Sequence, residues 1–111
     1  MPLNSGVNIP MIFRDIEGKD LPELLLIYVD VFTASPWNEN WQYEDVISRL
    51  EWLYDTKGFI GIAAESTQGI AGSILGIMQP TKDMNSFQIR EFFVRPALQS
   101  KGIGEKLISK L

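Results

Sequence analysis

The chain has 111 residues, of which 45% are hydrophobic and 22% are charged, and this balance is typical of a single soluble domain with a modest core. Ten Lys and Arg residues against fourteen Asp and Glu residues give a formal net charge of -4, which disfavours general attraction to nucleic acid or to an anionic membrane. The sequence contains no cysteine and no histidine, which excludes disulfides, thiolate and imidazole metal sites and Ser-His-Asp triads.

The N-terminal half predicts one strand followed by two helices. Residues 1–10 lack a basic region followed by an apolar core, and no apolar run approaches the roughly 20 residues that span a bilayer, so we expect a cytoplasmic protein. Residues 11–16 are typical of a short strand. Asp20 with Glu23 three residues later resembles a capping box, and the helical spacing of the apolar residues that follow predicts a helix over residues 21–33. A second helix has Asn40 as its N-cap and ends at Gly58, with apolar positions at Tyr43, Ile47, Leu50 and Tyr54.

The C-terminal half predicts three strands and a helix. Residues 59–65 form a nearly continuous apolar run, and residues 70–79 form another after a turn, so the two most simply pair as an antiparallel hairpin. After a loop over residues 80–85, residues 87–95 form a further strand. A helix over residues 102–111 places Ile103, Leu107 and Leu111 along one stripe. The order β-α-α-β-β-β-α predicts one compact unit of mixed α/β architecture over residues 1–111.

Two glycines, Gly102 and Gly104, lie where the last strand turns into the last helix. Backbone N–H groups at such a turn can converge on an anion, which makes it a candidate phosphate site. A Walker loop is excluded because Gly-x-x-x-x-Gly-Lys-Ser/Thr appears nowhere, and a dinucleotide fingerprint would need a third glycine where Leu107 stands. A tight strand-to-helix turn with no ligand is the alternative.

Residues 99–104, Gln-Ser-Lys-Gly-Ile-Gly, resemble the acetyl-CoA motif Gln/Arg-x-x-Gly-x-Gly/Ala of the GCN5-related N-acetyltransferase (GNAT) family. The preceding residues 92–96, Phe-Phe-Val-Arg-Pro, are similar to the family's strand ending in Val-x-Pro, and the order of predicted elements is the family's order as well. The resemblance covers nearly the whole chain and implies an α/β (α+β) fold with a mixed sheet. It corresponds to the family's N-terminal portion through the motif helix, and the strand, helix and hairpin that normally follow are missing, so we expect one domain that is incomplete at its C-terminus.

The resemblance implies an N-acetyltransferase that moves an acetyl group from acetyl-CoA to a primary amine of a small molecule or a protein. Phe92, Phe93 and Val94 would lie along the pantetheine arm, with strand backbone groups pairing to its amides. The pyrophosphate of coenzyme A would bind at the motif, whose residues are Gln99, Ser100, Lys101, Gly102, Ile103, Gly104 and Glu105. Acetyl-CoA would act as a cosubstrate, and no metal is expected.

Direct transfer from a thioester to an amine needs no protein nucleophile, so a chain without cysteine or histidine can perform it. The reaction does need removal of a proton from an ammonium whose pKa is about 10, and Glu91, one residue before Phe92, is the best-placed carboxylate for that role. A structural ion pair with Arg90 or Arg95 is the alternative for Glu91. No tyrosine of this sequence matches the family position that protonates the leaving thiolate.

The loop between the first two helices supplies the candidate substrate residues Trp37 and Glu39. In the family this loop helps to line the acceptor side of the cleft, and aromatic walls with one carboxylate would suit a cationic amine. The alternative is that Trp37 and Trp41 simply fill the core between the helices.

A second function stays open, namely a non-catalytic module that binds coenzyme A or dimerises. The strand over residues 87–95 would lack its next neighbour, which exposes unpaired backbone groups and apolar surface. We therefore expect self-association into a homodimer, or a loosely packed C-terminal end.

Overall fold

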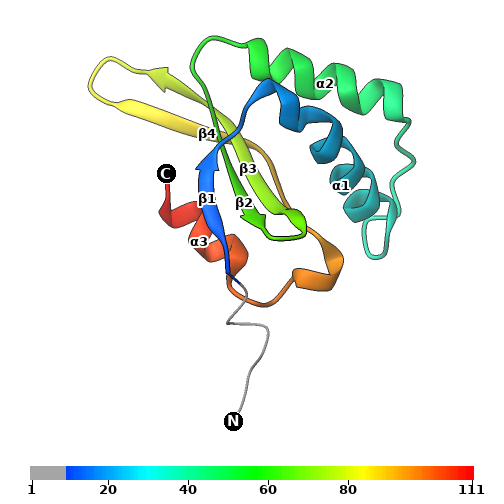
Figure 1. Ribbon diagram of the computed structural model, residues 1–111. Coiled ribbons are helices and arrows are strands. Elements are labelled where there is room, and N and C mark those ends of the chain that lie inside the picture. Colours follow the sequence, from blue (N-terminus) through cyan, green and yellow to red (C-terminus); the bar gives the residue numbers. More distant parts are fainter. Residues whose placement is uncertain (1–9) are drawn as a thin grey trace.

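A computed structural model describes residues 10–111, and residues 1–9, for which the sequence predicts no targeting segment, lie outside the described part. The predicted order β-α-α-β-β-β-α is confirmed, and two short 3-10 helices, η2 and η3, are added to it. The elements, which Figure 1 shows, are β1 (Ile12–Asp15), η2 (Gly18–Asp20), α1 (Leu21–Thr33), α2 (Tyr43–Asp55), β2 (Phe59–Ser66), β3 (Gly69–Pro80), β4 (Asn85–Val94), η3 (Pro96–Leu98) and α3 (Ile103–Ser109). No helix within residues 10–111 is both long and apolar enough to cross a bilayer.

The four strands form one antiparallel sheet in the order β1-β2-β3-β4, with α1 and α2 on one face and α3 on the other (Figure 1). Two apolar clusters hold these layers together. The larger cluster lies between the sheet and α1 and α2, and its fully buried members include Leu24, Ile27, Leu50, Ile70 and Leu75. The smaller cluster lies under α3 and consists of Ile62, Ala64, Ala71, Ile74, Ile103 and Leu107. The predicted mixed α/β architecture is confirmed.

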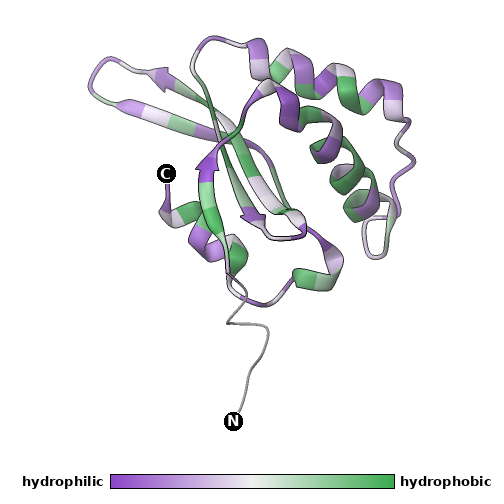
Figure 2. Ribbon diagram, in the orientation of Figure 1, coloured by the Kyte–Doolittle hydropathy of each residue, from purple (hydrophilic) through white to green (hydrophobic). Residues whose placement is uncertain are grey.

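The two N-terminal helices differ in how much of their surface is apolar. Hydrophobic residues follow one another along most of α1, whereas α2 alternates hydrophilic and hydrophobic residues (Figure 2). The expected bounds of α1 are confirmed, but α2 begins after Gln42 rather than Asn40. Its buried stripe is Val46, Leu50 and Leu53, so Tyr43, which the sequence places on the apolar face, is rotated out to solvent.

The C-terminal helix is shorter than expected. α3 ends at Ser109, where the sequence predicts a helix that continues to Leu111. Ile103 and Leu107 are buried as predicted, whereas Leu111 is exposed because it lies beyond the end of the helix.

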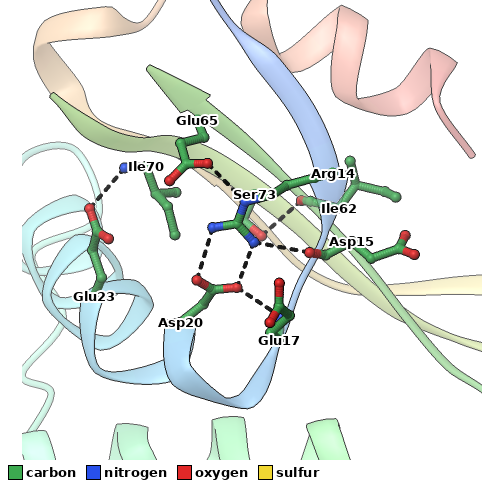
Figure 3. Close-up of polar contacts among 9 residues, drawn as sticks. All are labelled: Arg14, Asp15, Glu17, Asp20, Glu23, Ile62, Glu65, Ile70 and Ser73. Carbon is green, nitrogen blue, oxygen red and sulfur yellow. Dashed lines mark hydrogen bonds and ion pairs between the residues drawn. The ribbon is translucent and has the colours of Figure 1, made fainter. Parts of the chain in front are cut away.

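Arg14 on β1 holds the corner that leads into α1 (Figure 3). Its guanidinium donates to both carboxylate oxygens of Asp20, at 2.8 and 2.9 Å, and its Nε donates to Glu65 on β2 at 2.9 Å. Asp20 also accepts the backbone N–H of Glu17 at 2.7 Å, which completes a capping box at η2. The Arg14 guanidinium holds the pKa of the Asp20 carboxyl below its usual range.

The capping box expected between Asp20 and Glu23 is therefore wrong. Asp20 makes no side-chain cap bond to α1, because Arg14 and the preceding turn occupy its oxygens. Glu23 instead accepts the backbone N–H of Ile70 at 2.8 Å, and an Arg95 guanidinium nitrogen lies 3.4 Å from the same oxygen. The contact with Ile70 ties the first turn of α1 to β3 (Figure 3), and the contact with Arg95 ties it to the segment that follows β4.

At one point along the β3–β4 pair, β4 has one residue more than the part of β3 that it faces. Leu75 pairs with Glu91 and the next residue, Gly76, pairs with Ile89, so Arg90 is an extra residue in a β-bulge. A Cβ on Gly76 would collide with a backbone carbonyl oxygen of β4, and glycine therefore lets the two strands approach at this point.

Beyond the bulge, β4 presents alternate side chains to the two helical layers. Glu91 and Phe93 are buried toward α1 and α2, where Phe93 joins the larger cluster. Phe92 and Val94 face the side of the sheet that α3 covers. Within residues 10–111, no strand pairs with the outer edge of β4.

Candidate functional site

Two pockets adjoin at the C-terminal end of β4. The first, which we call the α3 pocket, has a volume of about 290 Å³ and is lined by Phe92, Val94, Gln99, Ser100, Gly102, Gly104, Glu105 and Ile108. The second, which we call the loop pocket, has a volume of about 240 Å³ and is lined by Val31, Phe32, Trp37, Phe92, Phe93, Val94 and Gln99. Phe92, Val94 and Gln99 line both pockets, so one end of β4 and the residue after η3 separate the two spaces.

The loop between η3 and α3 presents a row of backbone donors. Ser100 has a φ of 64° and Gly102 a φ of 83°, so two residues of this loop are left-handed. No acceptor within residues 10–111 binds the N–H groups of residues 100–105, and the next amide, that of Lys106, donates to the Gly102 oxygen at 3.2 Å. Successive unengaged N–H groups in such a turn form a concavity that attracts anions. The loop therefore has the donors that a phosphate group requires.

Both motif glycines border the α3 pocket. A Cβ added to Gly102 would meet no protein atom within 4 Å, so packing does not require glycine here, whereas the positive φ does. A Cβ added to Gly104 would come within 3.1 Å of the Phe92 ring. Both glycines line the α3 pocket, so side chains at these positions would take up space at its wall.

Seven of the ten residues predicted to bind the cofactor line the α3 pocket, and three do not. Phe93 lines the loop pocket, with its ring buried against α1. Ile103 is buried in the smaller cluster, and Lys101 lines neither pocket. For Ile103, whose side chain is buried, a contact with the cofactor would therefore use the backbone N–H. The binding roles of all ten residues stay predictions.

Glu91, the predicted proton acceptor, lies on the opposite face of β4 from the α3 pocket. Only 6% of it is exposed and it lines neither pocket. Arg49 on α2 donates to its carboxylate through Nε, and this contact raises the pKa of Arg49. The expectation that any ion pair would involve Arg90 or Arg95 is therefore wrong, because the partner comes from another element. A catalytic role for Glu91 stays a prediction.

Arg49 is the residue of this region that the sequence reasoning missed. It lies three residues after Val46 and four before Leu53, and so beside the buried stripe of α2. A charged residue beside the apolar stripe of a helix is the signal that could have indicated an ion pair with a buried carboxylate.

Tyr28 on α1 lies close to the same carboxylate. Its ring meets that of Phe93 edge-on, with 5.8 Å between the ring centroids. Burial, and after it the negative charge of Glu91, raises the pKa of Tyr28 to about 12. Tyr28 therefore keeps its phenol proton at neutral pH.

Three residues of the loop between α1 and α2, Trp37, Glu39 and Trp41, have different surroundings in the structure. Trp37 is 55% exposed, lines the loop pocket and meets the ring of Phe32 at a centroid distance of 5.7 Å. Glu39 lines neither pocket, and its carboxylate accepts the indole N–H of Trp41 at 2.6 Å. Trp41 packs against the larger cluster and meets Tyr28 edge-on. Core filling thus describes Trp41, whereas Trp37 borders a pocket.

Buried polar side chains in the described part of the chain are satisfied. Every buried side-chain nitrogen or oxygen there has a hydrogen-bond partner. The same residues contain no group of three or more His, Cys, Asp or Glu side chains that could hold a metal ion.

The arrangement of edge strand, glycine turn and short helix is shared with a known family. The family model described as Acetyltransferase (GNAT) family matches residues 21–111. The chain belongs to this GNAT family. The match begins at the first residue of α1 and includes β4, both pockets and the loop before α3. No curated protein sequence matches the chain.

Solved structures of GNAT proteins share the fold. The chain is similar to a possible acetyltransferase from Clostridium difficile, with a TM-score of 0.77 and 13% identity over 90% of this chain and 67% of that one. It is similar to a ribosomal-protein-alanine N-acetyltransferase from Brucella melitensis, with a TM-score of 0.72 and 14% identity over 91% of this chain and 68% of that one. A GCN5-related glucosamine N-acetyltransferase region of a fungal multi-domain β-N-acetylglucosaminidase gives a TM-score of 0.73 and 20% identity over 92% of this chain, which spans only 12% of the fungal protein. At these identities the likeness concerns the fold.

Proposed function

We propose that this GNAT chain transfers an acetyl group from acetyl-CoA to a primary amine. The observation that carries the proposal is the row of N–H groups at residues 100–105, which the described residues leave without acceptors, beside the α3 pocket. Acetyl-CoA combines a doubly charged pyrophosphate with a long, mostly apolar arm, and this loop and pocket offer one partner for each. Membership of an acetyltransferase family supports the same reaction.

The residues at the site fit this cosubstrate. The amides of residues 100–105 would hold the pyrophosphate, in a turn that contains the left-handed residues Ser100 and Gly102. Phe92 and Val94 would contact the pantetheine arm. The outer edge of β4, which pairs with no strand in the described range, offers N–H and C=O groups to the amides of that arm.

Acetyl-CoA supplies an activated thioester, so the amine nitrogen can bond to the acetyl carbon as the carbon–sulfur bond breaks, which yields an acetamide and the thiolate of coenzyme A, and the thiolate then takes a proton from water. The protein must orient the amine, accept its proton and limit access of water. Glu91 is our candidate proton acceptor, because it lies on β4 next to Phe92, and Arg49 on α2 fixes the position of its carboxylate. Glu91 lines neither pocket, so the proton would reach it through a bridging water or a side-chain movement.

The test combines calorimetric titration of acetyl-CoA with a thiol-release assay on a panel of primary amines. We expect heat of binding and release of thiol that depends on the amine. Gly102→Ala should weaken acetyl-CoA binding by about tenfold, equivalent to about 1.4 kcal/mol, because alanine is strained at this positive φ and the loop that carries the anion-binding amides would shift.

Gly69→Ala is the control for backbone strain at a positive φ, and its Cβ would in addition displace the Glu23 carboxylate, which lies 2.5 Å from it. Gly69 also has a positive φ, of 112°, but it lines neither the α3 pocket nor the loop pocket. This variant should lose stability and keep the affinity for acetyl-CoA. Absence of both heat and thermal stabilisation with acetyl-CoA would overturn the proposal, and binding without turnover of any amine would favour a non-catalytic module that binds coenzyme A.

A further inference from the structure

We infer that the acceptor amine carries an aromatic or branched aliphatic group, and that this group binds in the loop pocket. This assignment rests on the proposed function for the reaction, but the binding of such an amine can be measured without turnover. From the sequence, Trp37 and Glu39 were candidates that would suit a cationic amine, and in the structure Trp37 lines the loop pocket whereas Glu39 does not.

The lining of the loop pocket is almost entirely apolar. Phe32 and Trp37 contribute from α1 and the loop that follows it, and Phe92 and Phe93 contribute from β4. Among the described residues, no charged side chain lines this pocket, and Gln99 is its single polar side chain. An apolar group is stabilised here because its surface is removed from water, whereas a second ammonium group would lose hydration without a compensating partner.

The two carboxylates that the sequence proposed for the reaction, Glu39 and Glu91, are already engaged. Glu39 accepts the indole N–H of Trp41 at 2.6 Å, which turns its oxygens toward a core residue. Glu91 is buried and bound to Arg49. A polyamine or an aminoglycoside, whose additional ammonium groups need carboxylates, therefore finds no match in this pocket.

The size of the loop pocket sets an upper limit on the apolar group. Its volume of about 240 Å³ equals the liquid volume of about eight water molecules. This space accommodates one aromatic ring or one branched aliphatic side chain with a short linker. Trp37, which is more than half exposed, forms the outer wall and can pack against a ring edge-on, as it does against Phe32.

The position of the loop pocket suits an acceptor. Phe92, Val94 and Gln99 are shared with the α3 pocket, so a group seated in the loop pocket can point its amine across β4 toward the thioester. The amine nitrogen would then lie near the boundary of the two pockets, while the apolar group stays among the rings.

The test compares acceptors at saturating acetyl-CoA. Phenethylamine, tryptamine and isoamylamine represent apolar monoamines, and putrescine, spermidine and glucosamine represent polar acceptors. Peptides that differ only in an N-terminal Phe or Asp distinguish a protein amine from a small molecule with the same chemistry. We expect kcat/KM for the preferred apolar amines to exceed that for the polar acceptors by about tenfold or more, the discrimination that an apolar site can provide.

Trp37→Ala tests the pocket itself. Loss of one aromatic wall should raise the dissociation constant of phenethylamine about fivefold to tenfold in calorimetry, within the range expected for one aromatic contact. Trp52→Ala is the matched control, because Trp52 is an exposed tryptophan on α2 that lines neither pocket. This control should bind phenethylamine as the unsubstituted protein does.

The outcomes separate this inference from the proposed function. Acetylation of a polyamine or glucosamine with a kcat/KM equal to or above that of the apolar amines would overturn the inference about the loop pocket. The same result would still support the proposed acetyltransferase function. Absence of transfer to every amine would overturn the function, and calorimetry would then decide the inference by itself. Phenethylamine binding that Trp37→Ala weakens supports the pocket assignment, and absent binding or an equal loss in Trp52→Ala overturns it.

Discussion

Two carboxylates, Asp20 and Glu91, are each only 6% exposed, and each is held by an arginine from another element. Asp20 receives two bonds from Arg14 on β1, and Glu91 receives one from Arg49 on α2. A buried carboxylate that loses its guanidinium keeps its full desolvation penalty, so both pairs are sensitive to removal of the arginine. The pair at Asp20 lies at a corner of the fold, and the pair at Glu91 lies next to the candidate site.

The pair at Asp20 makes stability depend on pH. Because Arg14 lowers the pKa of Asp20 in the folded state, the pair stabilises the fold fully above the unfolded pKa of about 3.9 and loses this effect as the pH falls through the lower folded pKa. Asp20→Asn should lower the free energy of unfolding by about 2 kcal/mol at pH 7. Urea denaturation at pH 7 and pH 3 should show this difference shrinking at the lower pH.

Glu65→Gln is the control, because the Glu65 side chain bonds the same guanidinium from an exposed position. It should cost much less stability than Asp20→Asn. An equal difference between Asp20→Asn and the unsubstituted protein at both pH values would contradict the expected linkage.

The pair at Glu91 should respond unequally to the loss of its two members. Arg49→Met leaves a buried carboxylate without its partner and should cost about 3–5 kcal/mol in chemical denaturation. Glu91→Gln keeps a polar partner for a guanidinium whose side chain is 46% exposed, and should cost about 1–2 kcal/mol. The double variant Arg49→Met with Glu91→Leu should recover most of the stability lost in Arg49→Met.

Activity of the same variants tests the catalytic prediction for Glu91. If its carboxylate accepts the proton, Glu91→Gln lowers kcat while the KM for acetyl-CoA stays the same. A Glu91→Gln protein that is folded and has an unchanged kcat would restrict Glu91 to a structural role. A greater loss of stability in Glu91→Gln than in Arg49→Met would contradict the burial argument.

Partners of single residues were the least predictable from the sequence. Arg90 and Arg95 are near Glu91 in the sequence, but the partner in the structure is 42 residues away on α2. Likewise Glu23 was expected to cap its own helix and instead binds a backbone N–H on β3. Local patterns describe what a side chain could do, whereas the packing of helices on the sheet decides which partner it meets.

At the scale of elements, Gly76 allows β3 and β4 to pair at the bulge. Gly76→Ala should lower the free energy of unfolding by about 1–3 kcal/mol, because its Cβ would overlap a carbonyl oxygen of the paired strand. Gly18→Ala is the matched control, since its Cβ would lie 3.6 Å from Tyr54, an ordinary contact. This control should change stability by no more than about 0.5 kcal/mol. Thermal or urea denaturation measures both, and an equal effect would contradict the role assigned to Gly76.

Hydrophobic periodicity predicted the type and order of the elements, and the bounds of α1 in full. It misplaced the start of α2, because Asn40 has the chemistry of an N-cap but the turn of the loop puts Gln42 in that position. The bulge at Arg90 carries no signal in the composition of β4, since it depends on how β3 pairs with that strand. Periodicity describes one segment at a time. The start of α2 also depends on the loop before it, and the bulge in β4 depends on its pairing with β3.

At the scale of the whole molecule, β4 is an edge strand within residues 10–111, and Ile89 on it is 49% exposed. Edge strands with exposed apolar residues pair with other copies of the chain, so we predict concentration-dependent dimerisation in sedimentation velocity. Ile89→Lys should weaken the dimer, because lysine on an edge opposes strand pairing. Met84→Lys, at the exposed tip of the β3–β4 hairpin, is the matched control and should leave the dimer unchanged. A monomer at every concentration would contradict this prediction.

The two pockets differ in how far the sequence could predict them. The α3 pocket is built mostly from residues 92–105, so a contiguous motif could indicate it. The loop pocket combines α1, the loop after it, β4 and the residue after η3. Trp37 could be proposed for it, but Val31 and Phe32 have the pattern of ordinary core residues, and their second role comes from the way α1 lies across the end of β4.

The extra residue at Arg90 determines which side chains of β4 face each side of the sheet. The hairpin turn pairs Pro80 with Asn85, and uninterrupted pairing from there would place Glu91 opposite Ile74 and Phe92 opposite Ser73. Ile74 lies on the side of the sheet that α3 covers. With uninterrupted pairing, the negative charge of Glu91 would therefore lie where coenzyme A is proposed to bind, and the Phe92 ring would face α1 and α2. Because of this one inserted residue, the α3 pocket is lined by Phe92 rather than by the negatively charged Glu91, and Glu91 is instead buried against Arg49.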